Sequence, residues 1–150
     1  MIELTLPYPI SANRYWRPVK VANHITIVPT KEAKAYREEV ALLARVAGVR
    51  QPIRGRVAVG IRLFPNRPQD WVKRARVDPI AWDDTVQCID LDNANKVLLD
   101  SLKGIAFEDD SWVRRLQSER MEPDGAARVV IRIMAIALPR PPQAQLIDAA

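Results

Sequence analysis

Hydrophobic and polar residues follow two different periods along the chain, and these periods predict the elements of the fold. Segments in which every second residue is apolar, such as Gly55–Phe64, are typical of strands with one buried face. Segments in which apolar residues recur every three or four positions are typical of amphipathic helices. By these criteria we expect five strands, at residues 2–6, 24–28, 55–64, 112–121 and 127–137, and two main helices, at residues 31–47 and about 91–103.

Capping and turn residues support several of these boundaries. Thr30 is a suitable N-cap for the first helix, and Gly48 suits its C-terminal end. The turn at residues 122–125 (EPDG) is a hairpin signal, so we expect the strands on either side of it to pair with each other. The pattern predicts an α+β fold, a single domain with a mixed β-sheet and about two main helices packed on it.

The length of 150 residues fits one domain, which we place at residues 1–137. Residues 138–150 are rich in Pro, Ala and Gln and are expected to form a flexible C-terminal tail. Residues 65–89 form a long connection without clear periodicity. Irregular connections of this length are usually functional or disordered.

Charge and composition restrict the partners and the compartment. The net charge of +5 and the pI near 9.7 favour polyanionic partners. One cysteine rules out an intramolecular disulfide, and one histidine with one cysteine makes a structural zinc site very unfavourable. The sequence has no apolar run of about 20 residues and no signal-peptide pattern at its N-terminus. We therefore expect a cytoplasmic protein without a membrane segment.

Asp90 and Asp92 flank a single residue at the expected start of the second helix. One aspartate at this place can be an N-cap, which is a purely structural role. Asp92 and Lys96 are four residues apart and project toward one region of the helix surface. This pair is either a surface ion pair or a metal ligand beside a phosphate-binding cation, and the spacing alone does not separate the two interpretations.

Asp110 follows the same helix, after a turn. If the chain doubles back, its carboxylate can approach Asp90 and Asp92. Three clustered carboxylates repel one another unless a cation neutralises them or some are protonated. Oxygen ligands favour Mg²⁺ or its substitute Mn²⁺ over Zn²⁺, and Mg²⁺ is well suited to phosphodiester cleavage.

Three segments resemble motifs of the RusA family of Holliday-junction resolvases. Leu6–Arg17 (LPYPISANRYWR) is similar to the family's LPxPxSxNxxYR segment, and Asp90–Lys96 (DLDNANK) is similar to DLDNxxK. Leu99–Asp110 (LDSLKGIAFEDD) is similar to xDALxGxxxxDD. The resemblance covers residues 1–137, and the second and third motifs at this spacing are the specific ones. Residues 65–89 are longer here than in short members of the family.

The resemblance implies a homodimer that binds four-way or other branched DNA and nicks two strands symmetrically, in DNA recombination or repair. It implies that Asp90, Asp92 and Asp110 hold the metal and that Lys96 is the essential lysine. Asp109 competes with Asp110 for the third position because the two are adjacent.

Basic and aromatic residues are candidates for contacts with DNA, because phosphates attract cations and bases stack on aromatic rings. These candidates are Asn13, Arg14, Tyr15, Trp16, Arg17, Lys20, Lys73, Arg74 and Arg76. For Tyr15 and Trp16, packing beside the sheet is at least as favourable as stacking on bases. Asp83 and Asp84 oppose a DNA contact in their part of the chain.

Two other functions compete with a nuclease. A catalytically silent protein that binds branched DNA would use the same scaffold, but the intact acidic residues argue against it, because carboxylates beside DNA are costly without a metal. A metal-dependent hydrolase of nucleotides is disfavoured because the five scattered glycines form no phosphate-binding loop.

Overall fold

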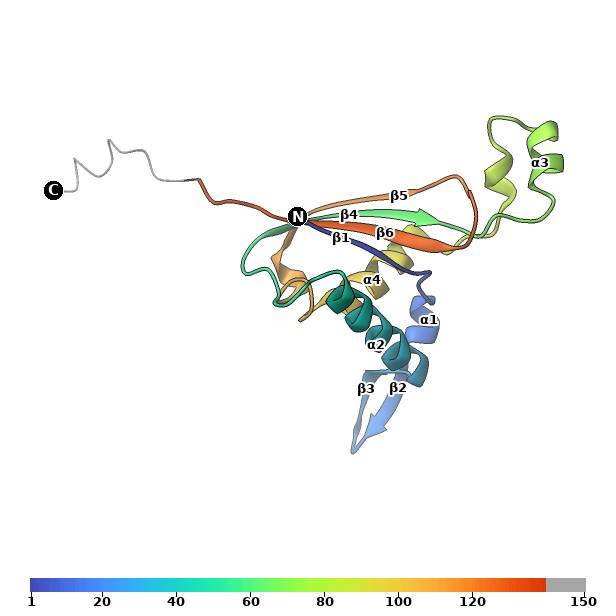
Figure 1. Cartoon of the computed structure of the whole chain (residues 1–150). Helices are drawn as coiled ribbons and strands as arrows, with labels where there is room; N and C mark the ends of the chain where they lie inside the picture. The colour runs from blue at the N-terminus through green and yellow to red at the C-terminus, as the bar shows by residue number, and fades with distance from the viewer. Residues whose placement is uncertain (140–150) are drawn as a thin grey trace.

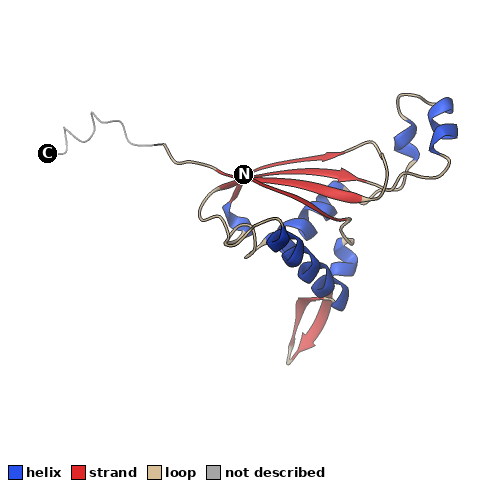
Figure 2. Ribbon diagram, viewed as in Figure 1, coloured by secondary structure: helices blue, strands red, loops and turns tan. Residues whose placement is uncertain are grey.

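The computed structural model describes residues 1–139, which form a four-stranded mixed sheet with its main helices on one face (Figures 1 and 2). In chain order the elements are β1 (Ile2–Pro7), α1 (Ala12–Tyr15), β2 (Trp16–Val21), β3 (His24–Pro29), α2 (Lys31–Val46), β4 (Val57–Phe64), α3 (Trp71–Val77), the 3-10 turn η1 (Trp82–Thr85), α4 (Leu91–Leu102), the 3-10 turn η2 (Asp110–Trp112), β5 (Val113–Arg120) and β6 (Arg128–Ala135). The fold is α+β, as the sequence predicts.

The strand order is β1-β6-β4-β5, with β4 and β5 parallel and the other neighbours antiparallel. Strand β4 follows the alternation expected from the sequence, since Val57, Val59, Ile61 and Leu63 are all buried, and Ala58 on its other face is buried too. They pack with the inward residues of β1 and β6 against α2 and α4. The core therefore lies between one face of the sheet and the two long helices.

Helix α2 begins and ends where local chemistry predicts. The Thr30 hydroxyl accepts a hydrogen bond from the Ala33 N–H at 3.1 Å, which satisfies one of the unpaired donors of the first turn. At the other end Gly48 has φ of +94°, and the Val49 N–H donates to the Ala44 carbonyl. This six-to-one hydrogen bond defines a Schellman motif, which explains the glycine.

The expected pairing of the last two strands is wrong. Strands β5 and β6 are not neighbours, because β4 lies between them. The connection at residues 121–127 crosses the end of β4, where the Met121 N–H donates to the Leu63 carbonyl and the Arg67 N–H donates to the Gly125 carbonyl. Seven residues easily span two strand spacings of about 4.8 Å each. Residues 122–125 thus belong to a long connection that bends at Gly125 and Ala126, and not to a tight hairpin.

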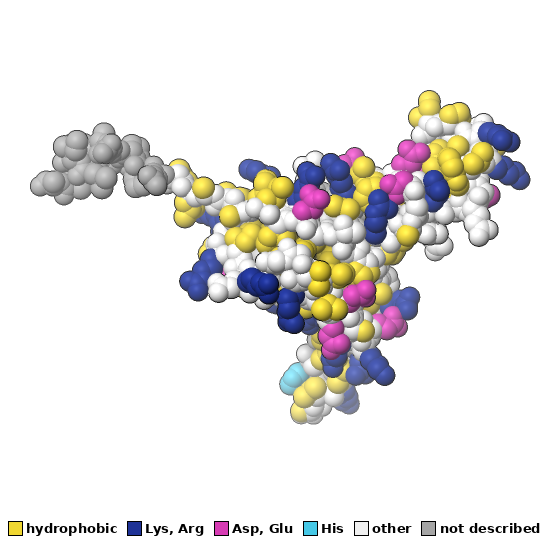
Figure 3. Space-filling model, in the orientation of Figure 1, with side chains coloured by type: hydrophobic (Ala, Val, Ile, Leu, Met, Phe, Trp, Pro, Cys, Tyr) yellow, Lys and Arg dark blue, Asp and Glu magenta, His cyan; other side chains and the backbone are white. Residues whose placement is uncertain are grey.

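The connection at residues 65–89, expected to be irregular, instead contains α3 and η1. We call its residues 66–87 the lobe. It projects beyond the end of the sheet, and basic side chains gather at its outer end (Figures 1 and 3). The rings of Trp71 and Trp82 lie 6.2 Å apart, and Trp82 is buried. Strand β2 was also not predicted; it forms a hairpin with β3 that projects from the helical side (Figure 1).

Of the expected tail at residues 138–150, residues 140–150 lie outside the described residues. No helix within residues 1–139 has both the length and the apolar character needed to cross a membrane.

Candidate active site

An open groove of about 670 Å³ lies where α4 begins. Asp90 and Asn93 line it from the start of α4, and Arg14 lines it from α1. The rest of the wall comes from residues 8–11 after β1, from Asn66, from residues 87–89 and from Ala127. Four parts of the chain that are distant in sequence therefore meet beside the first of the predicted metal ligands.

Asp90 occupies the N-cap position of α4 but does not cap the helix with its side chain. Its backbone carbonyl accepts from the Ala94 N–H at 2.9 Å, while its exposed carboxylate makes no capping hydrogen bond. Asp92, in the first turn, is also exposed, and no ion pair joins it to Lys96 in the described part of the chain. Neither of the structural roles considered for these aspartates is therefore realised.

The chain leading into Asp90 is fixed from two sides. The Tyr8 hydroxyl accepts from the Ile89 N–H at 2.7 Å and donates to Cys88 Sγ at 3.6 Å. Burial raises the pKa of Tyr8 to about 12, so the hydroxyl stays protonated at neutral pH. From β5, Arg120 donates to the carbonyls of Asp83 and Val86, both at 2.8 Å. Sequence reasoning missed Tyr8 and Arg120, because each contacts residues more than thirty positions away.

Tyr15 has no access to DNA, so its inclusion among the DNA-contacting candidates is wrong. Its side chain is fully buried, and its hydroxyl donates to Asp100 Oδ2 of α4 at 2.5 Å. Burial, reinforced by the Asp100 carboxylate, raises the pKa of Tyr15 to about 12. The packing role is the one observed, and it attaches the first motif to α4.

The other candidates near the N-terminus differ in their surroundings. Arg14 forms an exposed ion pair with Glu32 at 2.6 Å beside the groove. Asn13 is exposed in α1, Arg17 and Lys20 are exposed in β2, and Trp16 is half-buried against the core. Arg14, Asn13 and Arg17 therefore remain accessible to a ligand.

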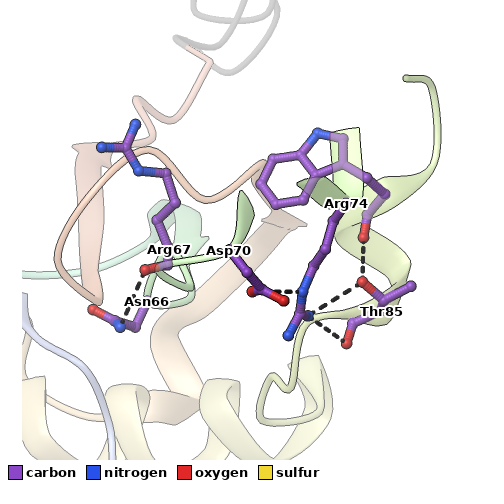
Figure 4. Close-up of polar contacts among 6 residues, drawn as sticks. Asn66, Arg67, Asp70, Arg74 and Thr85 are labelled. Atoms are coloured by element: carbon purple, nitrogen blue, oxygen red, sulfur yellow. Dashed lines mark hydrogen bonds and ion pairs between the residues drawn. The ribbon is translucent and has the colours of Figure 1, made fainter. Parts of the chain in front are cut away.

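The basic residues of α3 divide into two kinds. Arg74 donates to Asp70 at 2.9 Å and to the carbonyl and hydroxyl of Thr85 at 3.2 and 3.3 Å, so it holds the lobe together (Figure 4). Lys73 and Arg76 are exposed, and in residues 1–139 neither forms an ion pair. Only these two are available to bind an external anion.

Asp110 lies at the opposite end of α4 from Asp90 and Asp92. The helix has 12 residues and is therefore about 18 Å long. The chain then enters β5, whose first residue, Val113, pairs with the first residue of β4, at the far end of the sheet from the groove. Among residues 1–139, no three Asp, Glu, His or Cys side chains are grouped so that they could hold one metal ion. The chain does not double back as the sequence-based hypothesis requires.

Asp109 and Asp110 can now be distinguished by their contacts. Asp109 caps η2, accepting from the Ser111 hydroxyl at 2.6 Å and from its N–H at 3.3 Å. These hydrogen bonds lower the pKa of Asp109, and Lys103 lies 3.6 Å from its carboxylate. The Asp110 carboxylate is exposed and has no such partner within the described residues. Asp110 is therefore the better candidate for an external ligand.

A comparison with known protein families covers the part of the chain that carries these carboxylates. The family model described as Endodeoxyribonuclease RusA matches residues 7–134. The chain belongs to the RusA endodeoxyribonuclease family. No curated protein matched the chain in a separate search. The RusA match runs from the last residue of β1 into β6, and thus includes the groove and both ends of α4. Membership in the RusA family implies Holliday junction resolvase activity in general, and with it a branched DNA substrate.

Proposed function

We propose that the protein is a Mg²⁺-dependent endonuclease that resolves Holliday junctions by paired symmetric nicking, as a homodimer, in recombination or repair. The family match gives the general activity. The observation that supports this mechanism is the pair of exposed carboxylates, Asp90 and Asp92, which are not used by the fold although they stand at the first turn of a helix beside a groove. If these residues served only as helix caps, their carboxylates would accept hydrogen bonds from the N–H groups of the first turn.

The donor set fits the proposed metal. Asp90 and Asp92 offer carboxylate oxygens, which Mg²⁺ prefers and Mn²⁺ also accepts. Mg²⁺ is commonly held by one or two protein carboxylates, with water and substrate phosphate completing its shell. Such an ion, when bound, would lower the pKa of its water and polarise the scissile phosphate.

Lys96 is the proposed cation for the transition state. It lies one turn after Asp92 on the same side of α4, it is exposed, and no acidic side chain in the described part of the chain neutralises it. A fixed ammonium group there would stabilise the negative charge that develops on the phosphate oxygens.

In the proposed dimer, Asp110 of the second copy completes the carboxylate set. One chain alone separates Asp110 from Asp90 and Asp92 by the length of α4. A twofold axis between two antiparallel α4 helices would bring the end of each helix to the start of the other. It would also create two equivalent sites, as two symmetric cuts require.

The general activity is tested with a synthetic four-way junction and a linear duplex, each with Mg²⁺ or with EDTA. We expect paired symmetric nicks in the junction with Mg²⁺ only. Binding of the junction without cutting in Mg²⁺ or Mn²⁺ would instead identify a catalytically silent DNA-binding protein. Equal cutting of both substrates would leave a general nuclease.

The shared site is tested by mixing two inactive variants, Asp92→Asn and Asp110→Asn. If the site is shared between chains, a mixed dimer has one site with both substitutions and one intact site. We expect the mixture to recover a single nick per junction, whereas either variant alone binds the junction and does not cut. Absence of recovery in a mixture shown to contain mixed dimers would refute the shared site.

A further inference from the structure

The lobe is a separate, ordered projection at the end of the molecule where the groove opens (Figures 1 and 3). Its interior is fixed by several contacts that do not involve the groove. Arg67 stacks on the Trp71 ring at 4.7 Å. Arg74 pairs with Asp70 at the start of α3 and donates to Thr85 of η1, which joins the two elements (Figure 4). Side-chain order of this kind makes the lobe a rigid element rather than a loose loop.

The lobe is also fixed to the body of the protein. The Trp82 indole N–H donates to Glu122 Oε1 at 2.9 Å, and Arg120 binds two carbonyls of the lobe. The two ends of the lobe, Asn66 and Gln87, line the same groove as Asp90. A ligand that binds the groove and extends past the sheet would therefore meet the lobe in a fixed position.

Two cations stand on α3 without acidic partners in residues 1–139. Lys73 and Arg76 are three residues apart on α3 and share one side of it. Of the four acidic residues of the lobe, Asp70 binds Arg74, Asp78 accepts two backbone N–H groups, and Asp83 and Asp84 lie in η1 rather than on α3. The outer surface of α3 is thus complementary to phosphates.

The tip of the lobe presents an apolar side chain to solvent. Ile80 is 93% exposed and Val77 is 83% exposed. The turn that carries Ile80 is constrained, since the Ile80 and Ala81 N–H groups both donate to Asp78 Oδ1, at 3.2 and 3.0 Å, and Pro79 restricts its own φ. Proteins that deform DNA use such exposed apolar residues as wedges between bases.

We propose that the lobe is the element that recognises the branch of the DNA: Lys73 and Arg76 bind phosphates of one duplex arm, and Ile80 inserts where the arms meet. This inference rests on the proposed function. A protein partner is the weaker occupant, because the cores of protein interfaces are depleted in charged residues, and here Lys73 and Arg76 interrupt the small apolar surface. DNA explains both features, because its phosphates bind the cations and its bases can accept the apolar tip between them.

The phosphate contacts are tested by the double variant Lys73→Glu with Arg76→Glu. Its control is Lys31→Glu with Lys34→Glu, an equally spaced and exposed pair on α2 that changes the net charge by the same amount. Junction binding is measured without metal over a range of salt concentrations. We expect the lobe variant to lose roughly tenfold or more in affinity and its logarithmic salt slope to fall by about 2, and the control to change much less.

The wedge is tested by Ile80→Ser, with Ile25→Ser on the β2-β3 hairpin as the control, since Ile25 is 73% exposed. A junction with 2-aminopurine at the branch reports unstacking by its fluorescence. We expect the wild type and the Ile25→Ser variant to raise the fluorescence, and Ile80→Ser to bind with an unchanged salt slope but without this rise. Light scattering of each variant shows whether the lobe contacts a second copy.

The outcomes separate this inference from the proposed function. If the wild type neither binds nor cuts a junction, the proposed function fails. If the wild type cuts junctions and the lobe variants match their controls in salt slope and fluorescence, the lobe inference alone is overturned. Loss of the dimer in Ile80→Ser would also overturn it, because the tip would then be a protein interface.

Discussion

Replacement of Tyr8 by Phe removes one oxygen atom that holds the approach to the groove. The hydroxyl accepts from the Ile89 N–H at 2.7 Å and donates to Cys88 Sγ at 3.6 Å, immediately before Asp90. Phenylalanine keeps the ring and its packing against the core. The substitution therefore leaves the Ile89 N–H without its partner while the shape of the site stays the same.

The magnitude follows from that unpaired donor. A buried N–H that loses its acceptor costs about 1–3 kcal/mol, and half-burial of this position favours the lower part, about 1–2 kcal/mol. For a chain of this size that corresponds to a fall in Tm of about 2–8 °C. Asp90 is the next residue, so a shift of its carboxylate by about 1 Å would reduce the cleavage rate by up to about 100-fold.

Tyr36→Phe is the matched control. The Tyr36 hydroxyl donates to the Pro7 carbonyl at 2.8 Å, one residue before Tyr8, but it does not contact the segment that carries Asp90. Thermal unfolding, junction binding without metal and single-turnover cleavage with Mg²⁺ are measured for both variants. We expect similar losses of stability, nearly unchanged binding in both, and a large loss of cleavage in Tyr8→Phe only. Equal cleavage by the two variants would refute the positioning role of Tyr8.

Three other predictions concern charge, titration and backbone conformation. Lys96→Gln should abolish most cleavage yet change the free energy of unfolding by no more than about 0.5 kcal/mol, measured by urea denaturation, because the described structure gives Lys96 no ion pair. Burial raises the pKa of Tyr8 and Tyr15 to about 12 from 10.0. The free energy of unfolding should therefore be constant below pH 10 and fall as the pH rises to 12. Tyrosinate absorbance follows the ionisation, and circular dichroism follows the unfolding. Gly48→Ala should lower stability by about 1–2 kcal/mol in thermal unfolding, because φ of +94° is strained for any residue with a Cβ, and an unchanged Tm would contradict this.

Elements set by local chemistry could be predicted from the sequence. The alternation of Val57, Val59, Ile61 and Leu63 defines β4, and these four side chains are buried as the period of two requires. Helix α4 begins after Asp90 and ends just before Gly104, as its apolar spacing indicates. In these segments the same residues determine both the local conformation and the buried face, so a sequence window contains the necessary information.

The arrangement of those elements depends on contacts that a sequence window does not contain. The chain does bend at Gly125, yet β5 pairs with β4 because the connection between β5 and β6 is long enough to cross the end of β4. Residues 66–87 show no hydrophobic periodicity. Individual polar contacts, such as those of Arg74 with Thr85, stabilise α3 and η1, and no amphipathic face is needed for this. Tyr15 lies in a basic and aromatic segment that is typical of nucleic-acid contacts, but its hydroxyl is buried against α4.

The position of Asp110 connects catalysis with assembly. Asp90 and Asp92 stand at the start of α4, whereas Asp110 follows its other end, and a helix of 12 residues is about 18 Å long whatever the side-chain conformations. No rearrangement of exposed side chains closes that distance, since Asp and Lys side chains reach only a few ångströms. If all three carboxylates act on one phosphate, the third must come from another chain. Each chain would then contribute to two sites, with the start of α4 in one and Asp110 of η2 in the other, and cutting would occur only in the dimer.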